Sequence, residues 1–260
     1  YEIIFVNDAS KDQTLSVIKQ IADHDAHFHY VDLESNVGEN WALFAGISKA
    51  TGDVIVTIDG DCQNDPAYIP ALLEELSKGY RVVSGRRRER IGNFLTRRLP
   101  SQLANALTRI VSGVPVNDCG CGLKAYQREV LHGKFVPKGF MNRFSPVVFG
   151  VKRHEFAEIE IVDRARPSGH SHYGISRVFV VVRDLWALPF AVRGSRKWLT
   201  RFRSIQWLFL ILFAALVAWG MRTLAVAVSS LALLSFSNAK NLERFLDAQE
   251  NPRFRIKEFR

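Results

Sequence analysis

The sequence predicts an α/β fold, in which a mostly parallel sheet with flanking helices is followed by interfacial helices and a C-terminal membrane hairpin. Strand-like and helix-like segments alternate over residues 3–84, an order typical of a parallel sheet covered by helices. Residues 174–189 are mostly apolar with a thin polar stripe, which suits a helix at a membrane interface, although an ordinary core helix fits equally well. Residues 205–236 carry a single charge, Arg222, and this stretch predicts the hairpin.

Local patterns place the individual elements. Short apolar runs, largely β-branched, and one later alternating run predict strands at residues 3–6, 28–31, 54–58, 81–84 and 156–161. Apolar residues at helical spacing predict helices after Gln13, from 39 to 50, from 66 to 79 and across 94–111. Ser10 and Gln13 form a capping-box pattern before the first helix. Asp65 and Pro66 predict the N-cap and first turn of the third.

The composition excludes several classes of protein. The chain has 260 residues, of which 47% are hydrophobic and 23% charged, so it is neither disordered nor of low complexity. Three cysteines give no disulfide framework and no zinc site, which predicts a reduced, cytosol-facing environment. The formal charge of +9 is concentrated in residues 86–98 and 177–203, and the second run ends where the apolar stretch begins at Ile205. A basic patch beside an apolar segment indicates a membrane surface, and no nucleic-acid-binding module is evident.

The apolar stretch is short for its task. Residues 205–221 are 17 residues without a charge, and at about 1.5 Å per residue they reach roughly 25 Å, against a bilayer core of about 30 Å. One continuous span would bury Arg222 in lipid at a cost of about 2.5–3.5 kcal/mol, whereas a hairpin places it at the far surface. Basic residues flank both ends, which predicts that both ends lie on one side of the membrane. Two tight spans or a shallow re-entrant hairpin fit best, and a buried soluble hairpin is the alternative.

The strongest chemical motif is residues 59–66, Asp-Gly-Asp-Cys-Gln-Asn-Asp-Pro, which follows the apolar strand at 54–58. Two carboxylates one residue apart at the carboxyl end of a strand can face one cation. With an amide oxygen they form the oxygen-rich ligand set that Mg²⁺ or Mn²⁺ prefers, at the edge where open α/β sheets bind ligands. A turn that only caps the next helix needs Asp65 but leaves Asp59 and Asp61 unexplained.

A second polar pair, Asn7 and Asp8, ends the first predicted strand. An amide and a carboxylate in that place can hydrogen-bond a base or a ribose. The alternative, a simple N-cap, accounts for Ser10 but does not require Asp8.

Taken together, these motifs resemble a family 2 glycosyltransferase with the GT-A nucleotide-sugar fold. The resemblance rests on residues 2–14, Asn36-Val37-Gly38, Thr51-Gly52-Asp53 and residues 59–66. The polyprenyl-phosphate branch, which includes dolichol-phosphate mannosyltransferase, is similar in its paired apolar segments and at residues 117–126, 128–130, 169–177 and 241–259. The strand that normally opens the family, a Pro-x-Tyr-Asn-Glu-like segment that helps bind the base, is absent, so we expect the natural chain to begin earlier.

The resemblance implies inverting transfer of a hexose from a GDP- or UDP-linked donor to a polyprenyl phosphate, with Mg²⁺ or Mn²⁺ as cofactor. Asp59 would contact the donor ribose or phosphate, and the metal would lie on Asp59, Asp61 and Gln63. The donor would also be bound by Asn7, Asp8 and Gly38.

For the acceptor phosphate, the resemblance implies a second group of residues, with arginine best suited because its fork matches phosphate oxygens: Lys124, Arg128, Ser171, Tyr173 and Arg177. A lipid phosphate is already an anion at neutral pH, so the reaction needs positioning and charge stabilisation more than a base. Asp118, the third catalytic candidate beside Asp59 and Asp61, is then either a base or a residue that orients the sugar or Lys124.

The same resemblance divides the chain into a catalytic domain (1–170), interfacial helices (171–204), two short membrane segments (205–237) and a cytoplasmic tail (238–260). It implies a place in the cell (inner) membrane with the catalytic domain on the cytoplasmic side. Two alternatives stay open. One is a membrane transferase that elongates a polysaccharide or glycolipid and needs a carboxylate base such as Asp118 for a neutral hydroxyl. The other is a truncated, non-catalytic membrane partner.

Overall fold

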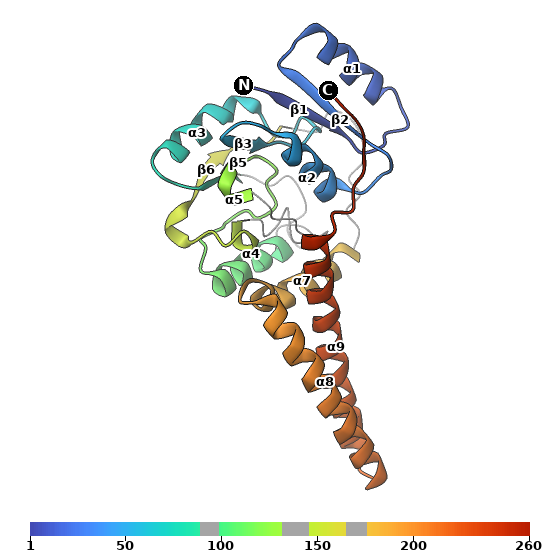
Figure 1. The fold of residues 1–260 in the computed structure, drawn as a ribbon. Helices are drawn as coiled ribbons and strands as arrows, with labels where there is room; N and C mark the ends of the chain where they lie inside the picture. Colours follow the sequence, from blue (N-terminus) through green and yellow to red (C-terminus); the bar gives the residue numbers. More distant parts are fainter. Residues whose placement is uncertain (89–98, 132–145, 165–175) are drawn as a thin grey trace.

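The computed structural model describes residues 1–88, 99–131, 146–164 and 176–260, and within them the strands form two sheets (Figure 1). The first sheet has the order β1–β2–β7, with bounds Ile3–Asn7, Phe28–Leu33 and Ile256–Phe259. The second has the order β3–β5–β4–β6, with bounds Val54–Thr57, Lys124–Gln127, Val82–Arg87 and Phe156–Ile161. Every strand expected from the sequence is present, and β5 and β7 are additional.

The sheets are mixed rather than uniformly parallel. β1 pairs with β2 and β4 with β6 in parallel, whereas β5 is antiparallel to both β3 and β4. β3, β4 and β6 therefore run the same way, with β5 reversed between β3 and β4. Because of this reversal the carboxyl end of β3 and the middle of β4 meet the start of β5, where Thr57 and Ser84 both pair with Lys124.

The helices of the first half connect consecutive strands. They are α1 (Thr14–His24), α2 (Glu39–Lys49) and α3 (Ile69–Ser77), the last preceded by the short 3-10 helix η1 (Pro66–Tyr68). The predicted cap at Asp65 is confirmed, since its Oδ1 accepts a hydrogen bond from the N–H of Ala67 at 3.0 Å. The predicted capping box of Ser10 and Gln13 is wrong. Asp12 takes its place, because its Oδ1 accepts from the N–H of Thr14 at 3.0 Å, just before α1.

Two clusters of buried side chains cover the two faces of the four-stranded sheet. α3 covers one face, where Leu72 and Leu76 pack with Val83 and Ala125. The other face carries a larger cluster that draws on α2, β5 and three later helices. These later helices are α7 (Ser176–Val192), α8 (Ser195–Ala218) and α9 (Arg222–Glu250), beside α4 (Leu99–Ser112) and the short α5 (Arg128–Leu131) and η3 (Arg153–Glu155).

One side of α7 belongs to the core. Ala187, Leu188 and Ala191 are buried in the larger cluster, while Trp186 is 61% exposed on the other side. The sequence fitted an interfacial helix and a core helix equally well at residues 174–189. The described second half of α7 has one side buried in the core and another side exposed.

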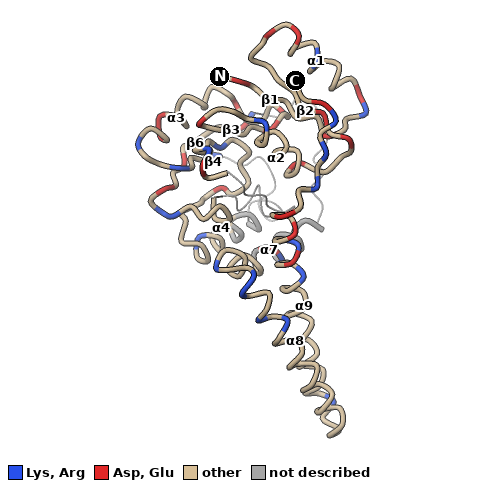
Figure 2. The backbone as a smooth tube through the Cα atoms, in the orientation of Figure 1, with Lys and Arg blue, Asp and Glu red and all other residues tan. Residues whose placement is uncertain are grey.

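α8 and α9 pack against each other as a hairpin that projects from the rest of the molecule (Figure 1). The chain reverses at Gly220, whose φ of +74° is a left-handed conformation that glycine adopts without strain. Arg222 begins α9 directly after this reversal, so the hairpin is confirmed and a single continuous span is excluded. Figure 2 shows that Lys and Arg lie mainly toward the base of the hairpin.

The hairpin does not bury its apolar side chains. Both helices are long and apolar enough to cross a membrane, yet only 6% of the most apolar window of α8 and 22% of that of α9 is buried. The core helix of a soluble domain would be mostly buried, so this exposure argues against the soluble alternative.

The end of the chain returns to the body of the molecule. The last turns of α9 bury Leu242, Phe245 and Ala248 in the larger cluster. β7 then pairs antiparallel with β2, and the ring of Phe254 lies 6.3 Å from that of Trp41 in α2. The segment predicted as a cytoplasmic tail is therefore an integral part of the fold.

Candidate functional site

The carboxyl edge of the first sheet is braced by a buried pair of polar side chains. Nδ2 of Asn7, at the end of β1, donates to Oδ1 of Asp32 at 2.8 Å, and its Oδ1 accepts from the N–H of Ser10 at 3.3 Å. Asp32, on β2, is buried as well, and Nζ of Lys257 on β7 lies 3.8 Å from its Oδ2. Sequence reasoning missed Asp32, although a lone acid within an otherwise apolar end of a strand was a signal for it.

Asp8 holds the loop that leads into α2. Its two carboxylate oxygens accept from the backbone N–H groups of Val37 at 2.7 Å and Gly38 at 2.9 Å, and Nδ2 of Asn36 donates to its carbonyl at 3.1 Å. The structure thus brings together Asp8 and Gly38, both predicted to bind the donor, and shows that Asp8 positions this loop.

The turn after β3 carries the predicted metal ligands and is fixed in place. Oδ1 of Asp61 accepts from the N–H of Gln63 at 3.1 Å, and the carbonyl of Gln63 accepts from the N–H of Arg164 at 2.8 Å. Nδ2 of the buried Asn64 donates to Oδ1 of Asp163 at 3.0 Å. The turn is therefore tied to the segment that follows β6.

Asp59 lies directly against the backbone of Gly122. A Cβ added to Gly122 would lie 2.2 Å from Oδ2 of Asp59, so only glycine leaves room for this carboxylate. Asp59 keeps contact with solvent, yet desolvation by the surrounding protein raises the pKa of its carboxyl. Lys124 opposes that shift in the pKa, and the nearby charge of Asp61 adds to it. A cation beside the two carboxylates would relieve their repulsion.

Asp59 and Asp61 alone do not make a complete cation site, and their role as metal ligands stays a prediction. In the described part of the chain no three His, Cys, Asp or Glu side chains converge on a metal position. Mg²⁺ at phosphate sites is commonly held by one or two carboxylates together with phosphate oxygens. The same turn also presents Gln63 and Oδ1 of Asn64, a buried acceptor without a hydrogen-bond partner. These oxygen donors fit a divalent cation that arrives with a diphosphate.

Asp118 is buried and held by Arg87, at the end of β4. Nε of Arg87 lies 2.6 Å from Oδ2 of Asp118 and Nη2 lies 2.9 Å from Oδ1, while Nη1 lies 3.6 Å from Oδ2 of Asp163. Burial disfavours the charged guanidinium, but hydrogen bonding to Asp118 and the charge of that carboxylate outweigh it and raise the pKa of Arg87. The site therefore has a permanent cation, close enough to lower the pKa of Asp59.

Lys124 is a second buried cation at this edge. It starts β5 opposite Thr57 of β3, and its Nζ donates to the carbonyl of Cys121. Its charge acts on Asp59, so the structure places Lys124 beside the carboxylate pair. Its role in binding the acceptor phosphate stays a prediction.

Arg128, predicted to bind the acceptor phosphate, follows the far end of β5 from Lys124, and its role in binding the acceptor stays a prediction. The far end of β5 meets the start of β3, where Gln127 pairs with Val54, about 10 Å along the strand from Lys124. The Arg128 guanidinium donates to the backbone carbonyls of Thr51 and Gly52. The Arg128 side chain therefore stabilises the turn before β3, at the opposite end of that strand from Asp59 and Asp61.

Three predicted acceptor residues cannot be placed in this way. Ser171 and Tyr173 lie outside the described residues. Arg177 is in the first turn of α7, and its side chain also lies outside the described part. Their role in binding the acceptor phosphate stays a prediction.

Most residues of this edge lie in a segment that matches one sequence family. The model of Glycosyl transferase family 2 matches residues 1–133. The chain belongs to this family. The family 2 match spans the chain from β1 through β5 and includes Asp8, Asp59, Asp61, Asp118 and Lys124.

Curated relatives extend the similarity beyond that match. The chain is similar to a dodecaprenyl-phosphate galacturonate synthase from Rhizobium johnstonii, with 36% identity over 197 residues, which cover 74% of this chain and 58% of the relative. It is also similar to an undecaprenyl-phosphate 4-deoxy-4-formamido-L-arabinose transferase from Shewanella sediminis, with 36% identity over 187 residues, 71% of this chain and 56% of the relative. The chain thus spans little more than half the length of these curated relatives.

Solved structures support the fold of this chain. A glucosyl-3-phosphoglycerate synthase from Mycobacterium tuberculosis superposes with a TM-score of 0.55 and 20% identity, over 74% of this chain and 69% of that chain. At that identity the likeness bears on the fold alone, and it confirms the predicted GT-A-like class.

Proposed function

We propose that this protein transfers a sugar, a hexose, from a nucleotide-diphosphate donor to a polyprenyl phosphate. The observation that carries the proposal is the 36% identity over 74% of the chain to a relative named for dodecaprenyl phosphate, supported by a second relative named for undecaprenyl phosphate. The assembled edge of Asp59, Asp61, Lys124 and Arg87 supplies a site of matching chemistry.

In this proposal the donor, linked to GDP or UDP, lies at the carboxyl edge of the sheets. Asn7, Asp8 and Gly38 shape the part of the site that receives the base and ribose. The fold neighbour from M. tuberculosis has been solved with Mn²⁺ and UDP-glucose. A bound Mg²⁺ or Mn²⁺ would neutralise charge on the leaving diphosphate, with Asp59, Asp61 and Gln63 holding it.

The reaction is a single displacement with inversion. An oxygen of the lipid phosphate forms a bond to the anomeric carbon as the bond from that carbon to the diphosphate oxygen breaks, and the nucleoside diphosphate leaves as an anion. No proton moves, because the attacking phosphate is already ionised. Arg87 and Lys124 supply fixed positive charge beside the leaving group, where it stabilises the developing negative charge without reorganisation.

Elongation of a polysaccharide or glycolipid fits the site less well. A neutral hydroxyl acceptor needs a general base, and the candidate for that task was Asp118. Both oxygens of Asp118 are engaged by Arg87, which favours the ionised carboxylate as a partner of the guanidinium over a proton acceptor. The assembled site likewise argues against a purely non-catalytic role.

We further propose that the hairpin anchors the protein in the cell (inner) membrane, with residues 1–170 and 238–260 on the cytoplasmic side and residues 171–204 at the interface. The pairing of β7 with β2 requires both ends of the hairpin to lie on the side of the catalytic body. The basic residues before and after the hairpin favour the cytoplasmic side.

The test is a transfer assay with membranes that contain the protein. Polyprenyl phosphate is incubated with a panel of GDP- and UDP-linked sugars, including a uronic acid and a formamido pentose, and the glycolipid is identified by mass. Asp61→Asn should abolish product formation, whereas Asp53→Asn, at the opposite edge of β3, should keep it. Product made only on a neutral glycan acceptor would overturn the proposal.

A further inference from the structure

Cations at the base of α8 fall into two groups. Arg196 and Arg203 turn toward α9, where Nη2 of Arg196 lies 2.5 Å from Oε1 of Glu250 and Nη2 of Arg203 lies 2.6 Å from Oε1 of Glu243. These two cations are neutralised within the hairpin. Both ion pairs link α8 to α9.

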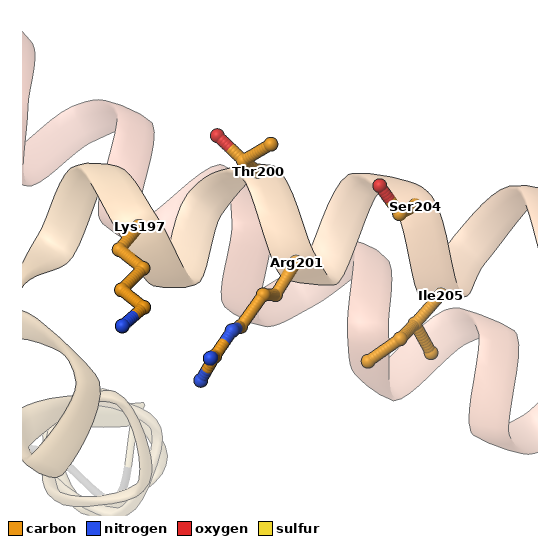
Figure 3. A pocket seen from close by; sticks show the side chains of 5 residues that line it. All are labelled: Lys197, Thr200, Arg201, Ser204 and Ile205. Carbon is orange, nitrogen blue, oxygen red and sulfur yellow. The ribbon is translucent and has the colours of Figure 1, made fainter.

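Lys197 and Arg201 form the second group. Both are exposed, and among the described residues neither has an acidic partner within ion-pair distance. They are one helical turn apart, and Figure 3 shows both side chains on the same side of α8 as Ile205. With Thr200 and Ser204 they line a shallow groove of about 450 Å³. Cζ of the Arg201 guanidinium lies 4.9 Å from the centroid of the Trp198 ring, a cation–π contact that holds the charged end of this exposed side chain at the surface of α8.

The side of α8 that carries these cations becomes apolar one turn further on. Ile205, Leu208 and Leu212 continue the same side and are 37%, 62% and 43% exposed. Ile205 is four positions after Arg201, so its backbone lies about 6 Å further along the helix.

The same boundary recurs on α9. Phe236 is 47% exposed, and Nζ of Lys240, one turn later, lies 5.8 Å from the centroid of its ring. The two helices are aligned at this level, because Oγ of Ser235 donates to the carbonyl of Phe202 at 2.9 Å. A single plane therefore divides charge from apolar surface across both helices.

We propose that Lys197 and Arg201 form a binding site for the headgroup phosphate of an anionic phospholipid of the surrounding bilayer. The phosphate lies in the groove between the two cations, and one acyl chain runs along Ile205 and Leu208. This site is outside the sugar-transfer edge, which is formed by Asp59 and its neighbours. It rests on the proposed insertion of the hairpin into a membrane, and it adds a lipid that is not a substrate.

The test uses the full chain, purified in a neutral detergent. Its thermal unfolding is followed while phosphatidylglycerol or phosphatidylcholine is titrated, since a ligand of the folded state raises Tm. Each cation near an anionic surface is worth about 1 kcal/mol, so two of them should favour phosphatidylglycerol by roughly ten- to thirtyfold in apparent affinity. Lys197→Gln with Arg201→Gln should reduce that preference to about twofold or less.

Two matched variants guard the interpretation. Lys78→Gln with Arg153→Gln makes the same change in net charge on exposed residues far from the hairpin and should leave the preference intact. Lys197→Arg with Arg201→Lys keeps both charges and should retain most of it. An undiminished preference in the Lys197→Gln, Arg201→Gln variant would overturn the proposal.

Other ligands separate the sources of phosphate. Equal stabilisation by inorganic phosphate would overturn a lipid site, and displacement of phosphatidylglycerol by stoichiometric polyprenyl phosphate would make the groove an acceptor site instead. Sugar transfer is measured on the same samples. If the wild-type protein shows the lipid preference but no sugar transfer, the result counts against the proposed function alone. If it transfers sugar but shows no lipid preference, the result counts against this lipid site alone.

Discussion

The guanidinium of Arg87 forms a bidentate ion pair with the carboxylate of Asp118, at 2.6 Å from Nε to Oδ2 and 2.9 Å from Nη2 to Oδ1. Both side chains are largely buried. If one partner were removed, little water could reach the other and solvate its charge. It joins the end of β4 to the loop before β5. The loop that it fixes supplies Gly122, against which Asp59 packs.

Removing one partner of this pair should destabilise the fold. Arg87→Ala leaves the Asp118 charge buried and uncompensated, and we expect a loss of about 3–5 kcal/mol in the free energy of unfolding. Arg86→Ala breaks an exposed ion pair with Glu160 and should change it by about 0–1 kcal/mol. Denaturant unfolding in detergent measures both. Similar losses in the two variants would show that the buried pair has no special role.

The contact between Gly122 and Asp59 predicts a selective loss of donor binding. Gly122→Ala places a methyl group 2.2 Å from the unshifted Oδ2 of Asp59, so the carboxylate must leave its present position. We expect donor affinity, measured by nucleotide titration with Mn²⁺, to fall by about tenfold or more, since a displacement of about 1 Å can lower rates a hundredfold. Gly60→Ala meets nothing within 4 Å and is the control. Wild-type affinity in the Gly122→Ala variant would mean that the position of Asp59 is irrelevant to the donor.

Asp59 should destabilise the metal-free protein at neutral pH. Because the folded state raises the pKa of its carboxyl above the ordinary value of 3.8, its favourable contribution is present below that value and is lost as pH rises through the folded-state pKa. Asp59→Asn should therefore raise Tm at pH 7 in the absence of metal, with the difference disappearing toward pH 3.8 and below. It should also abolish sugar transfer.

The control for this prediction is Asp53→Asn, at the other end of β3. Thermal unfolding of both variants is recorded between pH 4 and pH 8 in a chelator. A lower Tm for Asp59→Asn than for wild type at pH 7 would contradict the account of Asp59 as a destabilising carboxylate that is kept for function.

Sequence patterns were sufficient where structure is local. The apolar run at residues 54–58 predicted β3, and the acids that follow it lie where the end of a strand should place them. Arg222 was correctly placed at the reversal of the hairpin, because a charge in the middle of an apolar stretch marks the point that must reach water.

Long-range pairing was beyond the reach of those patterns. Nothing local reveals that β5 inserts antiparallel between β3 and β4, and this reversal is what sends Arg128 to the far edge and Lys124 to the near one. β7 is likewise invisible in sequence, since four residues acquire strand character only by pairing with β2.

The return of the chain after the hairpin changes how a soluble form should be made. A truncation at Ile205, the natural choice if residues 238–260 were a free tail, removes Leu242, Phe245 and Ala248 from the core. Loss of several large buried side chains costs about 2–5 kcal/mol each, which exceeds the typical stability of a domain when summed. We expect the truncated protein to aggregate.

Excision of the hairpin should succeed instead. Oγ of Ser235 donates to the carbonyl of Phe202 at 2.9 Å, so the two helices are adjacent where the apolar part begins, and a flexible linker of about four residues can join Ser204 to Ser237. The excised protein should remain monodisperse without detergent, bind donor nucleotide within about threefold of the full chain, and lose transfer to membrane-bound polyprenyl phosphate. Size-exclusion chromatography and nucleotide titration check these expectations. If the excised protein aggregates as the truncated protein does, residues 205–236 are needed for folding and are not only an anchor. If the protein truncated at Ile205 is soluble and fully folded, the end of α9 and β7 are dispensable to the core.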